Sequence, residues 1–207
     1  MTNSNFVNDV TGYFDIGAGT QTGGPTVSSR HSAQTLASWI SRVNYSLLDR
    51  YLMTLTYRED GSSRFAVNKK WGAFPSAAVA WRASSEPWFR GISAINDLKF
   101  RFSYGLVGNP SIRPYQSLAS LNNTGYSFAG TPVSGYFVNV VGNPDLTWET
   151  TRQVDEGVDL ALWNRFNITA DAYRKRTTNL LLQVSLPFET GFESALANRG
   201  SLENKGF

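Results

Sequence analysis

Apolar and polar residues alternate along several segments of the chain, the pattern of β-strands with one apolar and one polar face. In the clearest segment, residues 98–108 (LKFRFSYGLVG), Leu98 and Phe100 alternate with Lys99 and Arg101. The pattern predicts about six strands and therefore an all-β fold. The predicted strands are residues 37–47, 51–58, 76–82, 98–108, about 148–162 and about 167–180.

The predicted connections between these strands differ in length. Turns of about three residues fall near Asp49 and Asn164. The long polar loops are 59–73, 108–147 and 181–197, and residues 83–97 form one longish connection. If the strands are antiparallel, all three long loops fall at one end of the sheet and 83–97 at the other. Strands of about 10 residues with short turns at one rim and long loops at the other are typical of an outer-membrane β-barrel.

The two faces of the predicted sheet differ in chemistry. Five basic side chains share the polar face, and we expect water in a barrel lumen to solvate them, since a closed apolar core could not hold unpaired charges. They are Arg42, Arg58, Arg82, Lys99 and Arg101. The apolar face would meet lipid, with an aromatic girdle at each end. The girdle residues would be Trp81, Trp163, Phe166 and Tyr51 at the short-turn end, and Tyr57, Tyr104 and Trp148 at the long-loop end. The alternative is a soluble β-sandwich, in which these aromatics pack between two sheets.

Composition narrows the possible functions of this 207-residue chain. Aromatic residues make up 14% and charged residues only 17%, which favours strands and turns over helical bundles. The absence of cysteine excludes disulfides and thiolate chemistry, and the single histidine, His31, excludes a histidine-rich metal site. The net charge of +3 is spread along the chain, so we expect no nucleic-acid partner. We expect no signal peptide in the stretch MTNSNFVNDV, which has no basic segment followed by an apolar core, and no membrane-spanning helix, since no apolar run of about 18 residues occurs.

Three motifs that suggest chemistry have simpler explanations. Glu59 and Asp60 are neighbours on a strand end and point to opposite faces, so they cannot act as a catalytic carboxylate pair. The stretch DGSSRF lacks the alternating oxygen ligands of a calcium loop. The glycine-rich stretch Gly17–Gly24 lacks the lysine of a phosphate-binding loop. We therefore expect no enzymatic activity, no cofactor and no metal.

The best candidate for substrate contact is loop 108–147. Its aromatic residues could stack on sugar rings, pack on another protein, or only pack the loop against its neighbours. Its asparagines could hydrogen-bond hydroxyl groups. The candidate residues are Tyr115, Asn122, Asn123, Tyr126, Phe128, Tyr136 and Phe137.

Several short segments of the sequence are more specific than the alternation of apolar and polar residues. In order, RVNYSLLDRYLMTLTYREDGSSRF, KKWGAFPSAAVAWR, LKFRFSYGLVGN, NPDLTWETTRQVDEGVDLALW, DAYRKRTTNLLL and NRGSLENKGF resemble the C-terminal barrel of SusC/RagA-type TonB-dependent outer-membrane transporters. The resemblance begins near Ser38 and assigns 36–207 to barrel strands and loops and 1–35 to a preceding extracellular loop. We expect Gly61 and Gly72 to supply turn conformations and Pro75 to begin a strand.

The resemblance implies a role in the uptake of oligosaccharides or peptides across the outer membrane. It also implies a SusD-like surface lipoprotein as a lid, TonB as the driving partner, and contact with outer-membrane lipid. Family barrels have about 22 strands and a plug domain, so we expect the chain to be a barrel fragment without the plug that does not insert or transport alone. A soluble β-rich carbohydrate-binding module remains the alternative.

One residue departs from the expected pattern of the apolar face. Counting by twos from Val154 to Leu162 places Glu156 on that face near mid-strand. A charge there is costly, by up to about 2–4 kcal/mol for Arg or Lys and by less for acids. Either the register shifts near Gly157 or this position is unusual.

Overall fold

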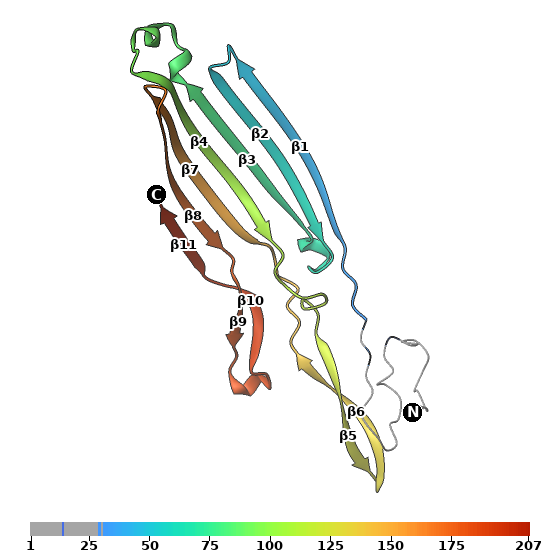
Figure 1. Cartoon of the computed structure of the whole chain (residues 1–207). Helices are drawn as coiled ribbons and strands as arrows, with labels where there is room; N and C mark the ends of the chain where they lie inside the picture. The colour runs from blue at the N-terminus through green and yellow to red at the C-terminus, as the bar shows by residue number, and fades with distance from the viewer. Residues whose placement is uncertain (1–13, 15–28, 30) are drawn as a thin grey trace. The chain divides into compact units, whose positions relative to one another are not determined.

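Figure 1 shows the computed structural model of the chain, which describes residues 14, 29 and 31–207. The chain divides into two units, Met1–Gln34 and Thr35–Phe207. In the first, the rings of Phe14 and His31 lie 4.4 Å apart. The predicted preceding loop, 1–35, falls almost wholly outside the described residues, and the glycine-rich stretch 17–24 falls entirely outside them.

Seven antiparallel strands form the main sheet of the second unit, in the order β1-β2-β3-β4-β7-β8-β11 (Figure 1). Two separate hairpins pair β5 with β6 and β9 with β10. The strands are β1 (Leu36–Leu47), β2 (Tyr51–Ser62), β3 (Trp71–Arg82), β4 (Ile95–Asn109), β5 (Ser120–Phe128), β6 (Thr131–Val140), β7 (Glu149–Leu162), β8 (Phe166–Thr178), β9 (Leu181–Ser185), β10 (Ser194–Asn198) and β11 (Ser201–Gly206). Short 3-10 segments are Val67–Lys69, Ala83–Ser85, Pro87–Gly91 and Phe188–Thr190. In the described part of the chain, no helix has the length and apolarity needed to cross a membrane.

The all-β antiparallel prediction is confirmed, with a different strand count. The sheet has seven strands rather than about six, because the final stretch NRGSLENKGF supplies β11, which pairs with β8. The predicted asymmetry of the connections is also present. Both hairpins extend beyond the end of the sheet opposite to the short turns (Figure 1).

The two short turns are built alike. Arg50 N donates to Leu47 O at 3.0 Å, and Arg165 N donates to Leu162 O at 3.0 Å. The two residues inside each turn have positive φ: 54° and 53° in the first turn, 48° and 52° at Trp163 and Asn164. Positive φ at both central positions defines the type I′ turn, whose twist matches that of the strands it joins.

The loop predicted at 59–73 is much shorter than expected. β2 continues to Ser62 and β3 begins at Trp71, with Asp60 paired to Gly72 and Gly61 to Trp71. The polar and glycine residues that suggested a loop therefore extend a hairpin. Its connection spans only residues 63–70.

The roles expected of Gly61, Gly72 and Pro75 were therefore wrong. A Cβ on Gly61 would lie 2.8 Å from the indole of Trp71, so this glycine makes room for a cross-strand ring. Pro75 lies inside β3, opposite Tyr57, but pairing of β3 with β4 stops at Ser76. Its missing N–H is tolerated because the strand is unpaired on that side.

Most of the buried apolar side chains lie at the loop end of the sheet. The cluster, called here the loop-end core, comprises Phe65, Phe74, Ile112, Leu146 and Trp148, with Leu106, Leu181 and Leu196 packed against it. Trp148 is only 5% exposed, so its predicted place in a lipid-facing girdle was wrong. Its ring lies 5.3 Å from that of Phe65 and 5.5 Å from that of Phe74.

The apolar face of the main sheet is uncovered. Trp39 is 72% exposed and Val43 is 60% exposed, and within the described residues no second sheet packs over them. The sandwich alternative requires such a sheet, so it fails.

The register also resolves the question about Glu156: β7 shows no shift at Gly157, and Glu156 stands opposite Phe102 and Ala172 on the apolar face.

Candidate functional site

The strand register places the five predicted basic residues on one face of the sheet. Side chains of directly paired residues share a face, and Arg42–Thr56–Ser76 and Arg82–Lys99–Asp159 are two such rows. The other basic residues stand an even number of positions from these rows. We call this the polar face; it bears Arg42, Arg58, Arg82, Lys99 and Arg101.

Arg101 is the centre of an ion-pair network on this face. It donates to Asp159 through Nε and Nη2, at 2.9 and 3.0 Å, in the bidentate geometry that strengthens Arg–carboxylate pairs. Nη2 also reaches Asp171 Oδ1 at 2.8 Å. Lys99 Nζ lies 3.8 Å from Asp159. One guanidinium therefore joins three adjacent strands, β4, β7 and β8.

Gly157 makes that crossing possible. It lies directly between Arg101 and Asp171 in the register. A Cβ at this position would lie 2.4 Å from Asp171 Oδ1 and 2.8 Å from Arg101 Cζ. Only a residue without a side chain leaves room for the guanidinium to pass over β7.

Two more of the five basic side chains also have carboxylate partners. Arg58 Nε lies 2.8 Å from Asp60, and Arg82 Nε lies 3.9 Å from Asp97. Arg42 differs, because its Nε donates to the hydroxyl of Thr56 at 3.1 Å. The polar face therefore carries mostly balanced charge rather than a uniformly positive surface.

Side-chain hydrogen bonds to the backbone tie the loops to the loop-end core. Trp148 Nε1 donates to Lys70 O at 3.1 Å, which links the residue just before β7 to the 63–70 connection. Asn198 accepts from Thr147 N at 2.9 Å and donates to Thr147 O and Asn179 O at 2.8 and 2.9 Å. The alternation of apolar and polar residues could not predict these contacts, because they lie outside the regular backbone pairing of the strands.

The predicted substrate loop 108–147 folds largely as the β5–β6 hairpin. Asn122 is paired with Phe137, and Tyr126 and Phe128 lie an even number of residues further along β5, so these side chains share one face. Tyr136 stands on the opposite face, in register with Asn123. The structure therefore separates the candidates into two groups.

The aromatic candidates are open to solvent. Tyr126, Phe128, Tyr136 and Phe137 all have exposed side chains, and Phe128 is 69% exposed. The ring of Tyr126 lies over Gly135, where a Cβ would be 2.7 Å from Cε1. Tyr115 is also exposed and lies in the preceding loop, with φ of 64°.

At the opposite end of the sheet, Glu86 organises the connection between β3 and β4. It accepts from Tyr51 Oη at 2.7 Å, Trp81 Nε1 at 3.2 Å and Arg50 Nη1 at 3.2 Å. The hydrogen bond from Tyr51, followed by that from Trp81, lowers the pKa of the Glu86 carboxyl below its ordinary value. The sequence pattern did not single out this residue.

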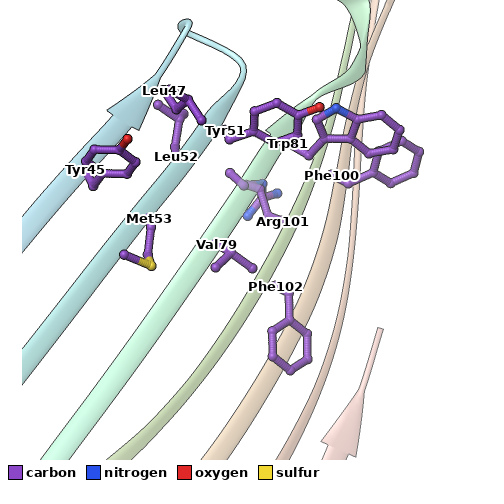
Figure 2. Close-up of a pocket in the computed structure, with 11 residues that line it drawn as sticks. Tyr45, Leu47, Tyr51, Leu52, Met53, Val79, Trp81, Phe100, Arg101 and Phe102 are labelled. Carbon is purple, nitrogen blue, oxygen red and sulfur yellow. The ribbon is translucent and has the colours of Figure 1, made fainter. Parts of the chain in front are cut away.

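The apolar face is hollowed close to this short-turn end. Figure 2 shows the groove, of about 520 Å³, with Met53, Val79 and Phe102 among its lining residues. The rings of Trp81 and Phe100 stack along one side, with centroids 5.7 Å apart. The lining is almost entirely apolar.

In the part of the chain that the structure describes, no group of three or more acidic or histidine residues could hold a metal ion.

Comparison of the sequence with known families gives one match along nearly its whole length. The family profile described as "TonB dependent receptor-like, beta-barrel" matches residues 2–207. The chain is 38% identical to TonB-dependent receptor P3 of Formosa agariphila over 98% of its length. It is 38% identical to TonB-dependent receptor SusC of Bacteroides thetaiotaomicron over 83% of its length.

Solved structures give the same result for the fold. The RagAB peptide importer in its open-open state matches 90% of the chain with a TM-score of 0.79 and 27% identity. The closed-closed state matches 82% with a TM-score of 0.74 and 29% identity. The chain spans about a fifth of the length of these proteins: 20% of P3, 18% of SusC and 20% of the open-open chain.

Proposed function

Since the chain belongs to the family of TonB-dependent receptor β-barrels of the outer membrane, we propose that it forms part of the wall of an importer for oligosaccharides or peptides. The observation that carries this proposal is the two-faced sheet. One face is apolar and uncovered, the other bears a salt-bridge network, and the hairpins extend from a single end.

In this proposal the apolar face meets lipid and the polar face lines the barrel lumen. The network around Arg101 supports the second assignment, because partly exposed ion pairs of this kind need water or other polar groups beside them. Paired charges give a lumen wall that does not bind either sign of solute strongly. Of the five predicted basic residues, Arg42 is the best placed to contact a passing anionic group, because its partner is a hydroxyl group rather than a carboxylate.

The β5–β6 hairpin is the proposed contact for substrate. Tyr126, Phe128 and Phe137 present exposed rings on one face, which suits stacking on sugar rings or on apolar peptide side chains. Asn122 on the same face can hydrogen-bond to hydroxyl or amide groups. Tyr115, Asn123 and Tyr136 complete the proposed set.

The proposed partners follow from the relatives. SusC and the RagAB importer are the similar proteins, so a SusD-like surface lipoprotein is the expected lid over the hairpin end. TonB is the expected source of energy, acting through a plug region. Neither partner contact is assigned to a residue of this chain.

The test uses the complete receptor that contains this segment, in cells that lack any other copy. The double variant Tyr126→Ala/Phe128→Ala should lower uptake of a labelled oligosaccharide or peptide mixture about tenfold, since aromatic anchors often contribute 1–2 kcal/mol or more. Leu121→Ala, an exposed apolar residue on the other face of the hairpin and outside the proposed set, is the matched control. Normal uptake by the double variant, at equal surface abundance, would remove the hairpin from the proposal.

Deletion of the receptor tests the importer function itself. Growth on oligosaccharides or on peptides as the sole nutrient should fail for one of the two classes and recover when the gene is restored. Unchanged growth on every substrate of both classes would rule out this function.

A further inference from the structure

Four basic side chains gather at the loop end of the apolar face, on β7, β8 and β11. The register places Arg152 directly opposite Arg176, and Arg174 directly opposite Lys205. All four side chains are exposed. Directly paired residues have Cβ atoms about 4.5–5.5 Å apart, so the four charges form a compact patch, called here the basic patch.

The basic patch begins where the apolar surface stops. On β8, Ile168, Ala170 and Ala172 occupy this face, and Arg174 is the next residue on it. On β7, Val154 is the last apolar residue before Arg152. Because the face changes from apolar to basic in one step, the patch lies at the depth where acyl chains give way to head groups.

The charges of the patch are not balanced within the described chain. Arg174 Nη2 pairs with Glu203 at 2.9 Å, but the Arg152 and Arg176 side chains form no salt bridge or hydrogen bond with a described residue. Even counting Glu156 and Glu203 on the same face, four cations stand against two carboxylates. Like charges directly opposite each other destabilise a sheet, and both rows contain such a pair. A bound anion would remove that cost.

The patch is confined to one sector of the sheet. At the loop end of the same face, β1 and β2 carry Trp39 opposite Glu59, without a basic side chain in that row. A general attraction to the membrane surface would not require four cations on three adjacent strands. The arrangement therefore suits a discrete ligand with more than one negative charge.

The geometry points to a binding site for the phosphate groups of an anionic glycolipid of the outer leaflet. Long loops of outer-membrane barrels face the cell exterior, so the loop end of the apolar face lies in that leaflet. Arginine binds phosphate bidentately, and the acyl chains of the same lipid would lie along Ile168 and Ala170. The inference rests on the proposed assignment of the apolar face to lipid.

The experiment measures lipid A binding to the complete receptor in detergent micelles, by native mass spectrometry. For the double variant Arg152→Gln/Arg176→Gln we expect about 30-fold weaker binding of bis-phosphorylated lipid A, as interfacial cations contribute about 1 kcal/mol each. Lys175→Gln, on the opposite face of β8, should bind like the unaltered receptor. Equal losses in the two variants would overturn the assignment.

A second comparison needs no variant. The unaltered receptor should bind bis-phosphorylated lipid A much more tightly than dephosphorylated lipid A. Equal binding of the two lipids would overturn the inference, and so would equally tight binding of an acidic peptide without acyl chains, which would indicate a protein partner. Nutrient uptake is not the readout, so failure of the import proposal remains distinguishable from failure of this one.

Discussion

At the scale of single residues, a glycine decides how charge is arranged on the polar face. Arg101 reaches Asp171 only because Gly157 leaves space above β7. This explains why a flexible residue stands in the middle of a long strand, where glycine normally weakens the sheet. The ion pair and the glycine form one unit.

Gly157→Ala should break that unit. Its Cβ would meet Arg101 and Asp171, so we expect the receptor to lose about 1–2 kcal/mol of stability, typical of a disrupted packing and ion-pair site. The measurement is the guanidinium concentration at which the barrel unfolds. Gly125→Ala is the control, since no atom lies within 4 Å of the Cβ it would add. Identical shifts for both variants would contradict the role given to Gly157.

Glu86 predicts a pH dependence at the short-turn end. Its folded-state pKa is lowered, so its hydrogen bonds from Tyr51 and Trp81 stabilise the fold above the ordinary value of 4.5. That contribution is lost as pH falls from there through the lowered folded-state pKa. Melting temperatures between pH 7 and pH 3 should therefore fall more for the unaltered receptor than for Glu86→Gln. Parallel pH profiles would exclude this contribution.

At the scale of elements, the alternation of apolar and polar residues predicted the strands well where one face of the sheet is apolar. It predicted them poorly towards the loop end, where that face is no longer apolar. The segments 98–108 and 37–47 lie within β4 and β1. Asp60, Gly61 and Gly72 interrupt the alternation, but the backbone pairing of β2 with β3 continues through them. The sequence pattern does not indicate a strand there, because no apolar face is present. The hairpins inside the long loops escaped prediction for the same reason.

The attachment of the β9–β10 hairpin depends on Asn198. Its amide makes three hydrogen bonds, to Thr147 N, Thr147 O and Asn179 O. Asn198→Ala should speed hydrogen exchange of the Thr147 amide about fivefold, since one net hydrogen bond contributes about 1 kcal/mol. Asn204→Ala on β11 serves as the control. Unchanged protection at Thr147 would show that the loop-end core alone holds the segment.

At the scale of the whole molecule, the division into two faces could be predicted and the details of the polar face could not. Counting by twos placed Arg82, Lys99 and Arg101 together, but Asp159, the partner of Lys99 and Arg101, lies on β7, 58 residues from Arg101 in the sequence. The two groups of aromatics on the β5–β6 hairpin likewise require the register. Trp148 shows the limit of the method, because an aromatic at a strand end suits a core as well as a girdle.

The face assignment makes a direct prediction about adjacent residues of β3. Val79 stands opposite Met53 and Phe102 on the apolar face, and Ala78 is its neighbour on the polar face. Val79→Arg should destabilise the receptor in a bilayer by up to about 2–4 kcal/mol, whereas Ala78→Arg should cost much less. Reversible unfolding in lipid vesicles measures both, and the opposite order would reverse the assignment of the faces.

The loop-end core also determines which part of the chain can be exchanged. Ile112 and Leu146 stand on either side of the β5–β6 hairpin, and both are buried in the same cluster. The β5–β6 hairpin between them can therefore be replaced by a hairpin of different length without moving β4 and β7, the strands on either side of it. Because its two ends are buried, the hairpin is a suitable graft site, where a different recognition loop can be introduced while the strands of the main sheet stay the same.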